Sequence, residues 1–292
     1  MSFMVNEIDI KNLIQKSAEL MEIIHEPFII QLLDNKTNKV FKVFSKTTNE
    51  NNIIAKVGLT GWGMSEFKAL KTLWEKKFEV PKPITYIRLH EELNSDWNFG
   101  NLYREIGVLF SYALKGQNLK QELTKINIYN ALNFLKKLHE DKSLINEIIN
   151  NYQKIEVERS INYAQKILEG KLANYLEEIL NQYQDLEIDY CFIHGGPRLE
   201  HFIIQNNQIW MIDFEGACAG DRFKDLGIFF TELFFENGIN EVELIRFYFR
   251  RELKKEENLR LLFFKLRALL VKMNFEPSEN SLKQIKRLVN YS

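Results

Sequence analysis

Alternating apolar and polar positions near the start of the chain predict a small antiparallel sheet. Two runs rich in β-branched and aromatic residues, EPFIIQLL and KVFKVFS, are joined by the polar turn DNKTN and followed by NNIIAKVGL. This pattern is typical of three antiparallel strands. The next segment, SEFKALKTLWEKKF, places Phe67, Leu70 and Trp74 on one helical face and stops before the prolines of VPKP, which cannot continue a helix.

The pattern changes near residues 112–117. The segment GNLYREIGVLFSYALKGQ indicates a pair of buried strands and a connection containing Gly116, after which helical periodicity runs to about Asn181 with almost no Gly or Pro. Two short strands, CFIHG and IIQNNQIWMIDF, interrupt this half before helices resume at Asp225, and the second contains a polar turn at Gln205–Gln208. We predict an α+β chain of two lobes, whose parts are a sheet lobe with five antiparallel strands and one main helix (1–111), a hinge (112–117) and a mainly helical lobe (118–292).

Composition and charge narrow the classes of function. The chain has 292 residues, 45% of them hydrophobic, and a net charge of −1, so neither a disordered protein nor a nucleic-acid partner is expected. Its first residues lack the basic start and apolar core of a leader, and its apolar runs are far shorter than a membrane span. We therefore expect a soluble, cytoplasmic protein without a membrane partner, in which Cys191 and Cys218 are buried reduced thiols.

Three charged residues stand out from their apolar surroundings. Asp213 ends the apolar run IWMID, where a carboxylate can ligate Mg²⁺ on a nucleotide or simply start a turn. Lys56 lies inside the apolar run IIAKV, where a lysine is either an edge charge or a phosphate ligand that needs a carboxylate partner. Glu66, ten residues later at the start of the predicted helix, supplies that partner, so we expect a Lys56–Glu66 ion pair.

The order of these residues along the sheet, helix, hinge and helical half resembles the aminoglycoside phosphotransferase and choline kinase-like branch of the protein-kinase fold. The most specific part is IDFEGACAGDRFKDLG, which is similar to the family's I-D-[WF]-E-x-A-x-x-G-D-x-x-x-D-L segment. The resemblance implies a two-lobed kinase-like fold. It also implies that Asp213 binds the metal and that Asp225 is the buried aspartate that braces the catalytic loop.

Weaker matches extend the resemblance over most of the chain. They are the lysine of the third strand, the glutamate of the first helix, KTLWEKKFEVPKP, Gly116 and the histidine of LKKLHE, His139. By this resemblance the chain binds ATP with Mg²⁺, or with Mn²⁺. Lys56 and Glu66 are then cofactor-binding residues, and the adenine lies against the backbone around Ser111 and Ala113.

The catalytic loop departs from the family pattern. The family has H-G-D-x-x-x-x-N, whereas this chain reads HGGPRLEH at residues 194–201. The aspartate that accepts the substrate's proton is replaced by Gly196, and the asparagine that holds a metal ion is replaced by His201. The loop between the first two strands, LLDNKTNKVF, also lacks glycine, although Thr37-Asn38 is similar to the family's S-N.

Other residues of the loop are candidates to replace the missing groups. Glu200 is the nearest acid that could take the proton or complete a metal site, and His201 offers an imidazole, which suits transition metals better than Mg²⁺. His194 opens the loop and is counted with Glu200 and Asp225 among the catalytic residues. Arg198 is expected to pair with Glu200 rather than to bind phosphate. A solvated loop is the alternative for the Glu200–His201 pair.

Two functions therefore stay open. The first is an ATP-dependent phosphotransferase with an altered catalytic loop, acting on a hydroxyl of a small molecule. The second is a nucleotide-binding pseudokinase or interaction module without phosphotransfer. No positive feature of the sequence favours a nucleotidyltransferase. The balanced charge of the helical half does not favour an aminoglycoside, and the sequence identifies neither the acceptor nor the oligomeric state.

Overall fold

The computed structural model describes residues 5–24, 27–34, 38–46, 52–90, 105–147, 153–168, 170–183, 186–188, 190–233 and 240–290. The chain divides into two compact units. The first consists of Met1–Gln117 and Ile203–Gly216, and the second of Asn118–Phe202 and Ala217–Ser292. Each unit is described below by itself.

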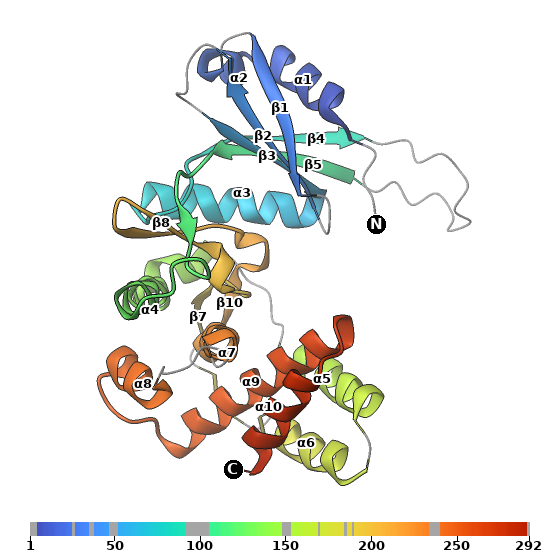
Figure 1. Ribbon diagram of the computed structural model, residues 1–292, viewed down its shortest axis with the longest axis vertical. Coiled ribbons are helices and arrows are strands. Elements are labelled where there is room, and N and C mark those ends of the chain that lie inside the picture. Colours follow the sequence, from blue (N-terminus) through green and yellow to red (C-terminus); the bar gives the residue numbers. More distant parts are fainter. Residues whose placement is uncertain are drawn as a thin grey trace, which may run out of the picture. The chain divides into compact units, whose positions relative to one another are not determined.

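A five-stranded antiparallel sheet forms the core of the first unit (Figure 1). Its strands, in the spatial order β1-β2-β3-β5-β4, are β1 (Phe28–Asp34), β2 (Lys39–Ser45), β3 (Ile53–Leu59), β4 (Pro83–His90) and β5 (Glu105–Tyr112). In β3 the alternating residues Ile53, Ala55 and Val57 are buried in the hydrophobic core. Because side chains alternate along a strand, Lys56 is turned to the opposite face of the sheet.

Helices cover both faces of this sheet (Figure 1). The short helices α1 (Glu7–Lys16) and α2 (Ala18–Ile23) bury Ile10, Ile14 and Leu20 in the core, and they pack on β1 and β4 respectively. Asn6 begins α1 with a capping box, since its side chain accepts from the Asp9 amide and Asp9 accepts from the Asn6 amide. On the other face, α3 (Thr60–Glu75) packs on β3, β4 and β5.

The segment Ile203–Gly216 supplies the remaining part of the first unit. Strands β8 (Phe202–Gln205) and β9 (Gln208–Met211) are joined by Asn206 and Asn207, which have φ angles of 53° and 60°. Asparagine tolerates this left-handed conformation, so the predicted polar turn is confirmed. The 3₁₀ helix η4 (Phe214–Gly216) follows β9 and packs against α3.

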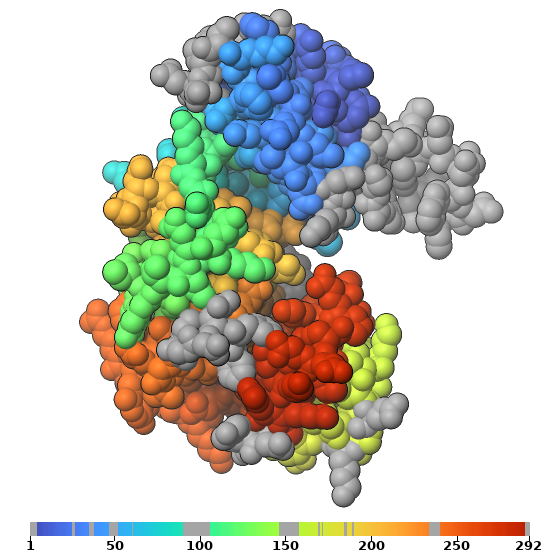
Figure 2. Space-filling model, in the orientation of Figure 1, coloured from blue at the N-terminus to red at the C-terminus, as the bar shows by residue number. Residues whose placement is uncertain are grey.

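The second unit is mainly helical. Its helices are α4 (Lys125–Glu140), η1 (Lys142–Glu147), α5 (Gln153–Ile167), α6 (Lys171–Gln182), η3 (Leu199–His201), α7 (Arg222–Leu233), α8 (Glu241–Phe249), α9 (Lys255–Phe275) and α10 (Glu279–Asn290). The long α9 packs against α5, α6, α7 and α10, and α10 forms part of the unit's surface (red in Figure 2). Strands β7 (Tyr190–Ile193) and β10 (Cys218–Asp221) pair antiparallel. The short β6 (Gln117–Asn118) lies where the chain passes from the first unit to the second.

The predicted fold class is confirmed, but some element assignments were wrong. Residues 100–117 were expected to hold two sheet strands, whereas the five-stranded sheet takes β5 from the described part of this segment (105–117) and its partner β4 begins at Pro83. A strand can start at proline because no ladder donor is needed there. Helices α1 and α2 were not anticipated. The expected division also differs at residues 203–216, which pack with the first unit. The roles assigned to the lobes and to the hinge stay predictions.

Candidate active site

Lys56 lies at the centre of a charged cluster in the first unit. Its Nζ is 2.8 Å from Oε2 of Glu66 and 3.3 Å from Oε2 of Glu215, and it also contacts the carboxylate of Asp213. The Lys56–Glu66 ion pair expected from the sequence is therefore present. The cluster joins the sheet, α3 and η4, because these elements supply the lysine and its three partners.

Two glycines make room for the Tyr86 side chain between α3 and the sheet. A Cβ on Gly107 of β5 would lie 1.8 Å from Oη of Tyr86, and a Cβ on Gly63 of α3 would lie 2.9 Å from Cε2 of the same ring. Tyr86 therefore fills the space above both glycines. One turn after Gly63, Glu66 is 4% exposed, so the helix presents its carboxylate to Lys56 in a nearly dry environment.

Asp213 reaches the cluster because the backbone turns sharply after β9. Its φ angle is 70°, a left-handed conformation that Asp tolerates better than most residues. The turn leads directly into η4, which carries Glu215. The side chains of Asp213 and Glu215 each keep 29% of their surface exposed, in contrast to Glu66.

The donor set of this cluster fits a divalent cation. Glu66, Asp213 and Glu215 each offer a carboxylate oxygen, and these three oxygens lie within 4.8 Å of one another. Carboxylate oxygens are the ligands that Mg²⁺ and Mn²⁺ prefer. Asn38 Nδ2 donates to Glu215 Oε2 at 2.9 Å and orients that carboxylate. Three carboxylates face one lysine, so a bound cation would balance the remaining charge.

The ion pairs set the direction of two pKa shifts. Burial by itself lowers the pKa of Lys56, but the attraction of Glu66, Asp213 and Glu215 outweighs it and raises that pKa. Burial raises the pKa of Glu66, an effect that the charge of Lys56 opposes. Lys56 is therefore a permanent cation, and Glu66 depends on it to stay ionised.

The predicted adenine contacts lie at the end of β5. Ser111 is 7% exposed and pairs with Ile54 of β3 and Pro83 of β4. The backbone N–H of Ala113 already donates to the Asn52 carbonyl at 2.8 Å. An adenine that bound here would therefore use other backbone groups of residues 111–114, and the role of Ala113 stays a prediction.

Partly exposed apolar residues lie on the face of the sheet that carries Lys56. Ile29 of β1 pairs with Phe44 of β2, and Lys42, two residues before Phe44, pairs with Ile54 of β3. Directly opposed residues share a face, as do residues two apart, so these side chains line one strip. Ile29 is 36% exposed, and Phe44 and Ile54 are half-buried. The strip could receive a flat apolar group beside Lys56.

In the second unit, Asp225 holds the backbone of the altered loop. It is fully buried and accepts hydrogen bonds of 2.8 Å from the amides of His194 and Gly195. Burial alone raises its pKa, but the interactions with His139 and His194, with the hydrogen bond from His139 the largest of them, more than compensate and lower it. The predicted position of Asp225 beneath the His194 loop is confirmed, whereas its contribution to catalysis stays a prediction.

A buried hydrogen-bond network continues from Asp225. His139 Nε2 lies 3.0 Å from Asp225 Oδ2, and its Nδ1 lies 2.6 Å from Oη of Tyr248. His139 and Tyr248 are each 2% exposed. Sequence reasoning found His139 only as a weak family match and missed Tyr248, for which no local signal exists.

The loop itself places the substitute residues at the surface of this unit. Gly195 has a φ of 86°, which favours glycine, but Gly196 has no atom within 4 Å of an added Cβ. The Glu200 side chain is 41% exposed, and its carboxylate lies 3.5 Å from Arg198 Nη1 and 3.7 Å from Lys120 Nζ. The expected Arg198–Glu200 pair is therefore present.

The two histidines of the loop lie side by side. The ring centroids of His194 and His201 are 5.6 Å apart, and His194 is buried. Asp213 and His201 belong to different units, so their shared metal site stays a prediction.

Sequence reasoning missed the metal-ligand candidate Glu215. It also missed Glu232 of α7, whose Oε2 accepts from the Leu199 amide at 2.8 Å.

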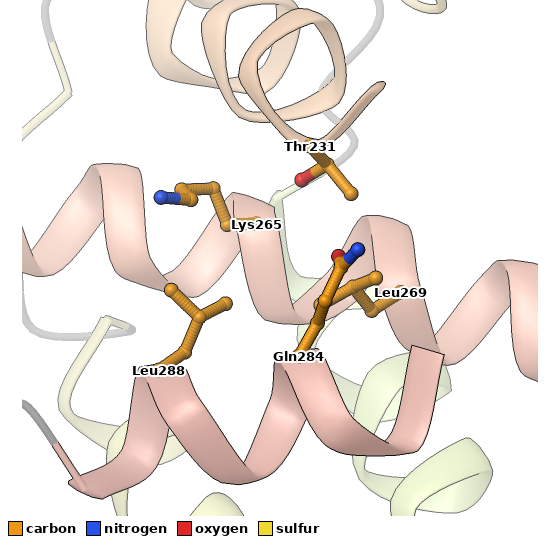
Figure 3. A pocket seen from close by; sticks show the side chains of 5 residues that line it. All are labelled: Thr231, Lys265, Leu269, Gln284 and Leu288. Atoms are coloured by element: carbon orange, nitrogen blue, oxygen red, sulfur yellow. The ribbon is translucent and has the colours of Figure 1, made fainter. Parts of the chain in front are cut away.

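A small cavity of the second unit is distinct from these groups. It lies between α7, α9 and α10 and is lined by Thr231, Lys265, Leu269, Gln284 and Leu288 (Figure 3). Its interior of about 10 Å³ has room for about one water molecule, far below the range of ordinary ligand sites. Lys265 is paired with Glu241 at 2.6 Å, and Thr231 donates to the Gly227 carbonyl. Cys191 and Cys218, elsewhere in this unit, are buried thiols that are not disulfide-bonded, and Cys191 Sγ donates to the Gly220 carbonyl at 3.5 Å.

Comparisons with known proteins identify a matching family and solved structures of similar fold. The model of the phosphotransferase enzyme family matches residues 63–260. A choline kinase from Cryptosporidium parvum superposes with a TM-score of 0.65 at 12% identity, over 97% of this chain and 94% of the other. A choline/ethanolamine kinase family protein from Mesorhizobium loti gives 0.65 at 16% identity, over 96% and 94%.

A further similar structure is the amicoumacin kinase hAmiN in complex with AMP-PNP and Ca²⁺. It gives a TM-score of 0.63 at 10% identity and covers 96% of this chain and 94% of its own. No curated protein matches the sequence. Among the described residues, no helix has both the length and the apolar character needed to span a bilayer.

Proposed function

The chain belongs to the phosphotransferase enzyme family, and we propose that it binds ATP and transfers the γ-phosphoryl group to a hydroxyl of a small molecule. The observation that carries this proposal is the cluster of Lys56 with Glu66, Asp213 and Glu215. A half-buried lysine whose pKa is raised by its partners, held by one buried carboxylate and faced by two more exposed ones, is suited to bind phosphate beside a divalent cation. The complex of hAmiN with AMP-PNP and Ca²⁺ supports the same ligand class.

Each residue of the cluster has a separate task in this proposal. Glu66 holds Lys56 in place, and Lys56 neutralises phosphate oxygens of the nucleotide. Asp213 and Glu215 would hold Mg²⁺ or Mn²⁺, which would shield the charge of the phosphates when bound. The half-buried strip of Ile29, Phe44 and Ile54 would accept the adenine.

Loss of the loop aspartate lowers the expected rate without excluding transfer. Positioning and charge neutralisation supply most of the rate of phosphoryl transfer, and a general base contributes about 10²–10⁴-fold, or roughly 3–5 kcal/mol. Glu200 is the candidate substitute base. Exposed ion pairs like those to Arg198 and Lys120 are worth only about 0–1 kcal/mol, so they leave the carboxylate free to turn toward an acceptor.

The acceptor is a small hydroxyl-bearing molecule and not a polycation. Around the loop, Glu200 is accompanied by the cations of Arg198 and Lys120, so this surface lacks the excess of acid that a polycationic antibiotic requires.

The alternative is a nucleotide-binding pseudokinase. The observations that favour it are Gly196, which offers no proton acceptor, and His201, which replaces the asparagine of the family's loop.

One experiment separates the two functions. The melting temperature and the heat of ATP binding would be measured with Mg²⁺ and with Mn²⁺, followed by transfer of radiolabelled γ-phosphate to a panel of hydroxylated metabolites. Binding with transfer supports the phosphotransferase, and binding without transfer to any acceptor supports the pseudokinase. Absence of ATP binding at millimolar nucleotide would contradict both.

A further inference from the structure

Tyr248 lies at the far end of the buried network that supports the altered loop. It is close to the end of α8 and contacts the ring nitrogen of His139, 109 residues earlier in the chain. Lys136 of α4 donates to the Tyr248 carbonyl at 2.7 Å, and its Nζ lies 6.0 Å from the centre of the tyrosine ring. Lys136 thus contacts both the backbone and the ring of Tyr248, and these contacts fix the position of the tyrosine hydroxyl.

The hydrogen-bond chemistry of this network determines the direction of each bond. A carboxylate can only accept, so His139 Nε2 must carry the proton that it shares with Asp225. A buried hydroxyl needs an acceptor, and among the described residues His139 Nδ1 is the acceptor within reach of the Tyr248 hydroxyl. Tyr248 therefore donates to Nδ1, and His139 is the neutral imidazole protonated on Nε2.

This tautomer matters for the loop. If the proton moved to Nδ1, the Nε2 lone pair would face Asp225 Oδ2, the oxygen that also accepts from the His194 amide. That arrangement is repulsive and would displace the carboxylate. Asp225 is also bonded to the amide of Gly195, which precedes Gly196, so a displaced carboxylate changes the position of the loop.

We propose that Tyr248 is a positioning residue, which fixes His139 in the Nε2-protonated tautomer and thereby holds Asp225 and the loop at residues 194–196. The loop's catalytic task rests on the proposed function, but the positioning does not. The tests below therefore use readouts that need no turnover, and they keep their meaning if phosphotransfer is disproved.

The first measurement is the tautomer itself. The chain has five histidines, so the imidazole nitrogens can be resolved in long-range ¹H–¹⁵N spectra and His139 assigned with His139→Gln. We expect a neutral ring with the proton on Nε2. A ring protonated on Nδ1, or a doubly protonated ring, would overturn the proposal because Tyr248 would then not be the donor.

The second measurement is the protection of the loop amides from hydrogen exchange. Tyr248→Phe keeps the ring and removes only the hydroxyl, and we expect the amides of His194 and Gly195 to exchange about tenfold faster or more. The amides of Cys191 and Phe192 in β7 should not change. The matched control is Tyr183→Phe, which removes another buried hydroxyl of the same unit, 3.4 Å from Asp221. Unchanged loop exchange in Tyr248→Phe would refute the proposal.

A third variant, His139→Gln, tests whether Tyr248 acts on the loop through His139. It remains informative if Tyr248→Phe alone does not fold. Glutamine at residue 139 can donate to Asp225 from its amide but has no tautomer to select. His139→Gln should therefore retain loop protection, and Tyr248→Phe should have little further effect in that background. His139→Leu removes the hydrogen bond to Asp225 altogether. If His139→Gln lost as much loop protection as His139→Leu, the tautomer of His139 would not be what holds the loop.

Discussion

Lys56 Nζ and Glu66 Oε2 lie 2.8 Å apart and join the central part of the sheet to the helix α3. The glutamate is almost fully buried, and the same lysine also contacts Asp213, which follows it by 157 residues. One cation therefore holds together three segments of the first unit. Its removal would leave three carboxylates without a neutralising charge.

We expect Lys56→Met to weaken ATP binding by about 100-fold or more, because a phosphate contact and the neutralisation of three acids are lost together. Isothermal titration calorimetry with Mg²⁺ measures the change. Lys71→Met, which removes an exposed charge from the same helix as Glu66, should bind ATP as the wild type does. Equal affinities of Lys56→Met and the wild type would exclude Lys56 from the nucleotide site.

We expect Asp213→Asn and Glu215→Gln each to reduce the divalent-ion dependence of ATP binding at least about tenfold, because each removes a charged oxygen ligand. Electron paramagnetic resonance of bound Mn²⁺ reports the metal directly. Glu75→Gln changes an exposed acid on α3 and should have no effect. If only Asp213→Asn changed metal binding, Glu215 would merely orient Asn38 and Lys56.

We expect Gly196→Asp to be tolerated, with a stability change within about 0.5 kcal/mol, because the position is open and its φ is not left-handed. Together with His201→Asn, it should raise phosphate transfer by up to about 10²–10⁴-fold if the loop lacks only its base and its metal ligand. Gly196→Asn with His201→Asn is the control, because it adds similar volume without a proton acceptor.

Glu200→Gln tests the substitute base in the wild-type loop, and we expect it to abolish basal transfer. Robust transfer that survives this change would mean that the proton leaves through solvent or the substrate. If neither the wild type nor the restored loop turns over bound ATP, the pseudokinase function is the correct one.

We expect Asp225→Ala to cost about 1–3 kcal/mol of unfolding free energy, because the amides of His194 and Gly195 lose their acceptor in a buried site. The pKa of Asp225 is lowered, so the folded state favours its ionised form. Its stabilising contribution is therefore present at neutral pH, and it declines once the pH falls below the ordinary value of 3.8. Urea unfolding of wild type and variant between pH 3 and pH 7 measures both effects.

Asp221 should show the opposite pH dependence. Burial raises its pKa to about 6 from 3.8, although the Phe223 amide and Arg260 oppose the shift. The folded state then binds a proton more tightly than the unfolded state, so this residue lowers stability by up to about 3 kcal/mol as the pH rises from about 4 to about 6. Asp221→Asn should remove this slope from urea unfolding curves, and an unchanged slope would show that Asp221 is ionised throughout.

The sequence by itself determined the parts of this protein that depend on local pattern. Alternation within IIAKV places Lys56 on the face opposite the core, and the apolar strand before Asp213 ends where a carboxylate can emerge. The position of Asp225 under the loop followed from a specific segment of family sequence, and the structure confirms it. The first two features are fixed within a few residues of the chain, whereas the contact of Asp225 with the loop spans about 30 residues and was inferred from the family segment.

Only the tertiary structure decided which distant residues converge. Asn38 and Glu215 are 177 residues apart, and although both lie in segments that resemble the family, nothing local in either segment indicates that the two side chains meet beside Lys56. Tyr248 reads as one more aromatic of a helix, and its hydroxyl acquires a task only because α4, α7 and α8 pack around His139. Strand β4 was missed because its partner β5 lies beyond an intervening segment, and pairing across such a distance is decided by packing of the whole sheet.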